Sequence, residues 1–100
     1  ELDWYENIGL CAPGEAEQLL RSGATTIGGR VPVNPSGGLA CFGEAVPAQA
    51  LQQVCEVVWQ LRGQADDRQV EGARVAMTQN GGGWLEGDSA AMAVHILSAD

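Results

Sequence analysis

Basic residues are scarce in this sequence of 100 residues. It contains five arginines and no lysine against thirteen acidic residues, so its formal net charge at pH 7 is −8. Such a surface repels phosphate backbones and anionic lipid headgroups, and it leaves no basic stripe to bind either of them. Nucleic acid is therefore a poor partner, and a P-loop, which needs a lysine after its glycines, is not supported.

Long hydrophobic runs are also missing. No apolar run approaches the roughly 20 residues that a membrane-crossing helix needs. A chain of this length buries only somewhat more than about 60% of its unfolded surface, which limits any cleft that it encloses alone. We expect a soluble single domain over residues 1–100, with no membrane insertion.

The cysteines are few and show no metal or disulfide pattern. Cys11, Cys41 and Cys55 are odd in number, far apart and without C-x-x-C spacing. Neither a disulfide framework nor a zinc site is supported, so we expect no bound metal and a reducing, cytoplasmic compartment. The sequence begins at Glu1 without a secretory leader pattern, so we expect a fragment or processed piece of a longer chain.

Helical spacing predicts three helices. The first covers residues 2–8, with Gly9 as its stop, and the second covers residues 15–22, with Gly23 as its stop. The third and clearest runs from about Val46 to Arg62. Its polar residues occupy one face, and an amphipathic helix of this kind is expected to turn its apolar stripe to the core. That stripe consists of Ala50, Leu51, Val54, Cys55, Val58 and Leu61.

Three strands are also predicted, at residues 28–34, 73–79 and 90–97. Pro32 marks the first as an edge strand or a strand end, and the last is apolar at nearly every position, as a strand buried on both faces should be. A glycine-rich turn from Asn80 to Ser89 joins the second to the third. The order predicts an α/β layer, in which the long helix carries the first strand to the second in a right-handed crossover.

The loop Asn34–Val46, with the sequence NPSGGLACFGEAV, is the first candidate site. Its glycines, Gly37, Gly38 and Gly43, serve either a tight connection or an anion cradle. Glu44 comes just before the long helix, which favours a helix-start carboxylate over a general acid. Cys41 is more typical of a packed residue than of a reactive thiolate.

The second candidate site is the segment that begins at Asn80. Its amides could form an oxyanion site, and a plain glycine turn explains the same residues equally well. His95 is the single histidine and has no second ligand or nucleophile at a recognisable spacing. Contacts with backbone or surface groups are therefore favoured over catalysis, and no Ser-His-Asp arrangement can be assembled.

Four segments of the chain resemble the C-terminal part of thiolase-superfamily proteins. The similarity extends to the sterol-carrier or lipid-transfer thiolases, often labelled acetyl-CoA acetyltransferases. It covers nearly the whole chain in order and spacing. The segments are YENIGLCAPGEAEQLL, VPVNPSGGLACFGEAV, VVWQLRGQADDRQVEGARVAMTQNGGG and AMAVHIL.

The resemblance implies the C-terminal half of a layered α/β thiolase fold, with the N-terminal half and its nucleophilic cysteine loop absent from this chain. It implies a homodimer acting on acyl-CoA thioesters by Claisen or retro-aldol chemistry, with coenzyme A thioester as substrate and no covalently bound cofactor. A small OB-fold, zinc-ribbon protein is the partner of some relatives. The isolated chain would then be inactive.

The family motifs assign the candidate residues. Asn34, Gly37, Gly38 and Gly43 match the pattern N-x-x-G-G followed by G-H-P, but Glu44 stands at the histidine position. Gln79 stands at the cysteine or histidine position of the second motif, followed by Asn80 and Gly81.

Both substitutions bear on chemistry. A carboxylate at the histidine position would oppose a developing oxyanion, and a glutamine donates hydrogen bonds but takes no proton. The sequence thus leaves two alternatives: a thiolase-like enzyme, or a non-catalytic homologue that binds acyl-CoA or scaffolds a partner.

Overall fold

The computed structural model describes residues 1–87 and 89–100, and it divides them into two compact units, Glu1–Pro35 and Ser36–Asp100. Asp88, which falls within the predicted glycine-rich turn, lies outside the described residues. Across these described ranges, no helix has both the length and the apolar character that a membrane crossing requires.

The first unit contains the two predicted short helices. These are α1 (Leu2–Asn7) and α2 (Ala16–Arg21), each followed by a glycine with positive φ, as a helix stop requires. The core of this unit consists of Tyr5, Ala16 and Leu19. Burial raises the pKa of the Tyr5 hydroxyl, and its hydrogen bond to the Glu1 carboxylate raises it further.

The strand predicted over residues 28–34 is wrong for the described structure. The segment makes isolated backbone hydrogen bonds, from Val31 N to Ala24 O and from Val33 N to Thr25 O, both 3.0 Å long. Pro32 lies between these two donors and has no N–H of its own. The segment therefore doubles back on residues 24–25 instead of joining a sheet.

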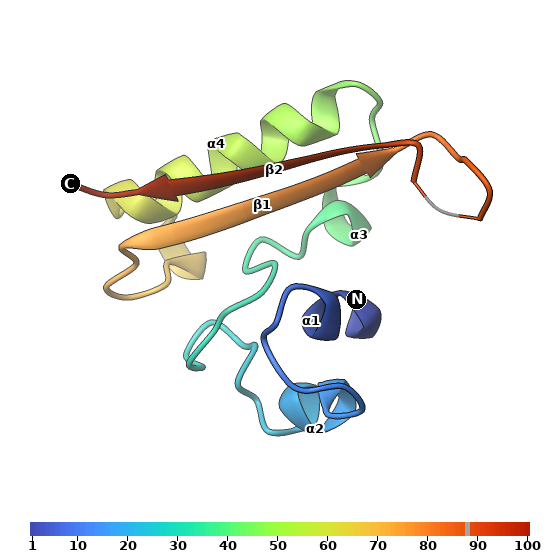
Figure 1. Ribbon diagram of the computed structural model, residues 1–100. Helices are drawn as coiled ribbons and strands as arrows, with labels where there is room; N and C mark the ends of the chain where they lie inside the picture. Colours follow the sequence, from blue (N-terminus) through green and yellow to red (C-terminus); the bar gives the residue numbers. More distant parts are fainter. Residues whose placement is uncertain (88) are drawn as a thin grey trace. The chain divides into compact units, whose positions relative to one another are not determined.

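The second unit is a small α/β layer. It contains α3 (Leu39–Phe42), α4 (Ala48–Arg62), the 3-10 turn η1 (Asp66–Arg68), β1 (Val75–Gly82) and β2 (Ala91–Ser98). The strands pair antiparallel, with Val75 opposite Ser98 and Gly82 opposite Ala91, and α4 lies across one face of them (Figure 1). The α/β class is confirmed. The crossover is not, because β1 and β2 form a hairpin and α4 precedes both.

The long helix is confirmed, but its most deeply buried residues are polar, which the sequence did not predict. Four polar residues recur along one side of α4 at intervals of four, three and four, which places them on one helical face. We call this set the polar stripe: Gln49, Gln53, Glu56 and Gln60. Three of its members are buried, with exposed fractions of 5 to 7%, whereas Leu51 of the apolar stripe is 70% exposed. The most deeply buried side of α4 is therefore its polar side, while Ala50, Val54, Val58 and Leu61 of the apolar stripe are half-buried.

A hydrogen-bonded network explains why the polar stripe faces inward. Arg68 Nε lies 3.1 and 3.0 Å from the two carboxylate oxygens of Glu56, and its Nη2 lies 3.0 Å from Oε2. Gln60 Nε2 donates to Glu56 Oε1 and to the carbonyl oxygen of Arg68, and Gln60 Oε1 accepts from the Val70 amide. Gln69 Nε2 donates to the carbonyl oxygen of Gln60. These bonds fasten the segment 63–70 onto α4.

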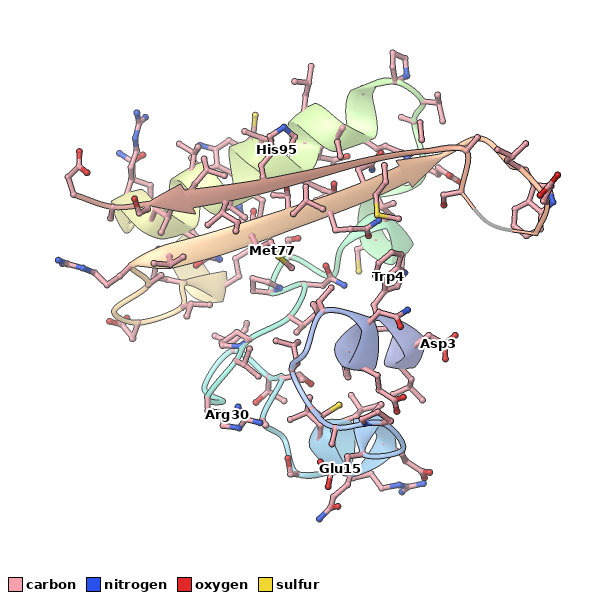
Figure 2. All side chains as sticks on the ribbon, viewed as in Figure 1. Asp3, Trp4, Glu15, Arg30, Met77 and His95 are labelled. Carbon is pink, nitrogen blue, oxygen red and sulfur yellow. The ribbon has the colours of Figure 1, made fainter. Side chains whose placement is uncertain are left out.

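Within the described residues of the second unit, α4 covers one face of the sheet. Successive side chains of a strand point to opposite faces, and Figure 2 shows His95 on the side of α4 and Met77 on the other side. Thr78, opposite His95, is buried, and the two side chains are 3.2 Å apart at Oγ1 and Nδ1. His95 thus has a side-chain partner. The prediction that β2 is buried on both faces is wrong, because all of its residues except Leu97 are exposed.

The Glu56–Arg68 pair gives a stability prediction. Arg68→Ala leaves a buried carboxylate short of its main donors and should lower the free energy of unfolding by about 1.5–3 kcal/mol, the range for hydrogen bonds to charged groups. Arg74→Ala is the control, because Arg74 is exposed and makes no ion pair among those found in the described residues. Its effect should stay within about 0.5 kcal/mol. Equal effects of the two substitutions in urea titrations would contradict the prediction.

Candidate functional site

The glycine loop before α4 has the backbone that its sequence suggests. Gly37, Gly38 and Gly43 have φ values of 85°, 61° and 81°, a region that side-chain-bearing residues rarely adopt. The helix α3 lies inside this loop and was not predicted from the sequence. A Cβ atom at Gly37 would collide with the Sγ and Cβ atoms of Cys41. The close approach of α3 is therefore one specific reason for a glycine here.

Asn34 belongs to the first unit, whereas the loop glycines belong to the second. Its side chain is exposed, and its φ of 48° is positive, which asparagine tolerates better than most residues. The match of Asn34 to the family motif therefore stays a prediction about the sequence.

Glu44 is exposed, and it is neither a cap nor a first-turn residue of α4. The helix starts at Ala48 with Pro47 as its N-cap, no side-chain capping bond and no acid in the first turn. The helix-start prediction was thus wrong, because the helix begins at Ala48, four residues after Glu44. Cys41 is an exposed, free thiol within α3 and does not lie at the start of α4.

Gln79, Asn80 and Gly81 are strand residues. The strand β1 continues to Gly82, so the turn predicted to begin at Asn80 starts later. Strand alternation places Gln79 and Gly81 on the face away from α4, the side of Met77, and Asn80 on the α4 face, the side of Thr78. The structure therefore does not direct the Gln79 and Asn80 side chains to the same face.

Ser89 joins Gln79 and Gly81 on that outer face. A Cβ atom at Gly81 would lie 2.7 Å from Ser89 Oγ and 3.5 Å from Gln79 Nε2. The missing side chain of Gly81 thus leaves room for an amide and a hydroxyl group. Sequence reasoning missed Ser89, because nothing in the pattern indicates that its hydroxyl lies beside Gly81.

This cluster of Gln79, Gly81 and Ser89 has limited but definite chemistry. The glutamine amide donates hydrogen bonds, and the serine hydroxyl both donates and accepts them. Neither side chain is a base at neutral pH, so the cluster can hold a carbonyl oxygen or oxyanion but cannot by itself remove a proton.

The helix α4 connects the two candidate regions. The glycine loop leads directly into its first turn, and Gln53 Nε2 donates a 3.0 Å hydrogen bond to the main-chain oxygen of Gln79. The sequence places Gln53 on the polar side of the helix, and nothing in its pattern indicates this contact with the sheet. Residues 26 positions apart in sequence are thereby joined.

A groove of about 370 Å³ also lies along α4, but its polar groups already pair with one another. Glu56 and Arg68 form the ion pair described above, and the Arg68 guanidinium carbon lies 5.7 Å from the Trp59 ring centre. In the described part of the chain, no group of three or more metal-ligating side chains gathers. The groove is lined by Ser36, Phe42, Gln52, Glu56, Trp59 and Arg68.

Comparison with known proteins identifies the family. Residues 1–98 match the family described as thiolase C-terminal domain-like. The chain belongs to this family. The match confirms the resemblance drawn from the sequence and agrees with the α/β architecture of this thiolase domain.

Three relatives illustrate the similarity. The thiolase domain is 50% identical over 93 residues to an acetyl-CoA acetyltransferase of Methanothermobacter thermautotrophicus, covering 93% of this chain and 23% of the relative. It is 48% identical over 80 residues to human sterol carrier protein 2, covering 80% of this chain and 15% of the relative. It is 43% identical over 84 residues to the benzoylsuccinyl-CoA thiolase subunit BbsB of Thauera aromatica, covering 83% of this chain and 22% of the relative. The chain thus spans less than a quarter of the length of each of these relatives.

The loop glycines of the thiolase domain give a matched prediction. Gly43→Ala should cost about 1–2 kcal/mol of unfolding free energy from its positive φ alone, since no atom lies within 4 Å of its added Cβ. Gly37→Ala should cost about 1–3 kcal/mol more, because Cys41 must also move. Cys41→Ala should recover part of that excess. The prediction fails if urea titrations give equal costs for both glycines.

Proposed function

We propose that this chain is the C-terminal part of a thiolase-like enzyme that forms or cleaves carbon–carbon bonds of acyl-CoA thioesters. The observation that carries the proposal is the family match over residues 1–98. Relatives named as an acetyl-CoA acetyltransferase and as a thiolase subunit support it. The substrate is a coenzyme A thioester from lipid or sterol metabolism, and no cofactor is bound covalently.

In this proposal the chain contributes hydrogen-bond donors and the rest of the protein contributes the nucleophile. Gln79 and Ser89, whose polar atoms both lie beside Gly81, hold the thioester oxygen on the outer face of β1. Glu44, which belongs to the glycine loop, is the ionisable group of the site. The chain alone would then have no turnover.

The exposed apolar surfaces support a larger parent. On α4, Leu51 is 70% exposed and Trp59 44%, and on the outer face of β2, Val94 is 53% and Ile96 72% exposed. Burying such side chains is favourable, at roughly 25 cal/mol per Å² of apolar surface. We assign this covering role to the N-terminal half of the thiolase fold, in a cytoplasmic homodimer.

A second candidate function is favoured by the identities of two side chains. Glu44 and Gln79 stand where the family pattern has histidine and cysteine or histidine, and the glutamine cannot exchange a proton. The alternative is a non-catalytic homologue that binds acyl-CoA or acts as a scaffold together with a small OB-fold, zinc-ribbon partner.

Thiolysis of acetoacetyl-CoA separates the two functions. The full-length protein should be active, and Gln79→Leu should lower kcat/KM by about 10²–10³, the loss expected for one oxyanion donor. Gln64→Leu is the control, because Gln64 is an exposed glutamine just after α4. The isolated chain should be inactive.

Two results would count against the enzyme. Turnover by the isolated chain would contradict the proposal that the nucleophile comes from the rest of the protein. Binding of acetoacetyl-CoA by the full-length protein without any turnover would instead favour the non-catalytic homologue.

A further inference from the structure

The peptide unit between Gln79 and Asn80 is held from two directions. A peptide unit is planar, so its six atoms from one Cα to the next move together. Fixing the carbonyl group of Gln79 therefore also fixes the Cα atom of Asn80 and its amide. Both side chains of the candidate strand end project from this one rigid plane.

Pairing with β2 fixes this peptide unit from one direction, and a hydrogen bond from Gln53 fixes it from the other. The register pairs Gln79 with Val94 and Asn80 with Ala93. From α4, Gln53 Nε2 donates to the Gln79 oxygen at 3.0 Å. Because a main-chain oxygen only accepts hydrogen bonds, the amide nitrogen of Gln53, and not its oxygen, must face the strand.

The sequence after Asn80 explains why the hydrogen bond from Gln53 is needed in addition to the strand pairing. Residues 81–83 are all glycine, so the strand end has no side chains there to pack against α4 or against its surroundings. Backbone bonds must then fix the position of Gln79, and the bond from Gln53 reaches it from a different element.

The side-chain oxygen of Gln53 shows that Gln53 is not at this position simply to fill space. Its Oε1 atom is buried and has no hydrogen-bond partner among the described residues, as is also true of Gln49 Oε1 one turn earlier. A buried acceptor without a partner is unfavourable, and a methionine would fill a similar volume without one. The favourable contribution of the Gln53 amide is thus its bond to Gln79.

We propose that Gln53 is a positioning residue of this site, acting through the Gln79–Asn80 peptide unit. The proposal rests on the proposed acyl-CoA function for its catalytic consequence, whereas the hydrogen bond itself can be tested without turnover. Gln53 contacts no substrate in this scheme. It sets where the Gln79 amide and the neighbouring Ser89 hydroxyl meet the reacting oxygen.

Kinetics form the first arm of the test. In the full-length enzyme, Gln53→Met should lower kcat by about 10- to 100-fold with KM nearly unchanged, because a small misplacement of a reacting group costs rate more than binding. Gln52→Met is the matched control. Gln52 is the preceding residue of α4, is half-buried, and makes no side-chain hydrogen bond among those found in the described residues. It should leave both constants unchanged.

A spectroscopic signature forms the second arm. Gln79–Asn80 is the single Gln-Asn dipeptide in these 100 residues. Protein labelled with carbonyl-¹³C glutamine and ¹⁵N asparagine therefore gives one HNCO cross peak from this segment. Loss of the hydrogen bond should move its carbonyl shift upfield in Gln53→Met and not in Gln52→Met.

The cross-peak shift and kcat of Gln53→Met together decide the proposal. A shifted cross peak together with a lower kcat supports the proposal. An unmoved cross peak overturns it whatever the activity, and a moved cross peak with normal kcat overturns the positioning role.

If the unsubstituted enzyme is inactive, the proposed function fails and the positioning role fails with it, even where the cross peak confirms the bond. Should Gln53→Met not fold, slow solvent exchange of the Gln53 side-chain amide in unsubstituted protein supports the bond, and rapid exchange overturns it.

Discussion

Glu56 brings a carboxylate to a position that is only 7% exposed, and the second unit is arranged around that constraint. A buried charge needs both an opposite charge and hydrogen-bond donors. Arg68 supplies the charge and Gln60 supplies a further donor, so the segment 63–70 must fold back onto α4. The polar side of the helix consequently faces inward, while Leu51 and Cys55 of the apolar stripe stay exposed.

The same orientation places the candidate site. Gln53 lies three residues before Glu56 on the polar stripe, so the ion pair that orients α4 also turns Gln53 toward β1. The bond to the Gln79 carbonyl then fixes the strand end, while Gly81 leaves space for the Gln79 amide and the Ser89 hydroxyl. The backbone of β1 thus connects Gln53, on the α4 side, with the candidate donor Gln79 on the outer face.

Sequence reasoning predicted what depends on local spacing. The three longer helices, their glycine stops and the two paired strands follow from periodicity and from residues such as Gly63. The orientation of α4 could not be predicted, because an apolar stripe normally indicates the core, and the partner of Glu56 lies twelve residues away. The candidate site stays a prediction, and only some of its residues follow from the sequence pattern. The motif indicated Gln79, but Gln53 and Ser89 reach it only through the tertiary fold.

The orientation of α4 is the central claim, and Cys55 reports on it most directly. Cys55 belongs to the apolar stripe and is exposed. In a variant that keeps Cys55 as its single cysteine, the thiol of the folded 100-residue chain should react with a chromogenic disulfide reagent almost as fast as in urea. In the proposed longer parent protein it should be protected, because the proposal has the N-terminal half covering that face. A Cys55 thiol that is already protected in the isolated chain would contradict this account.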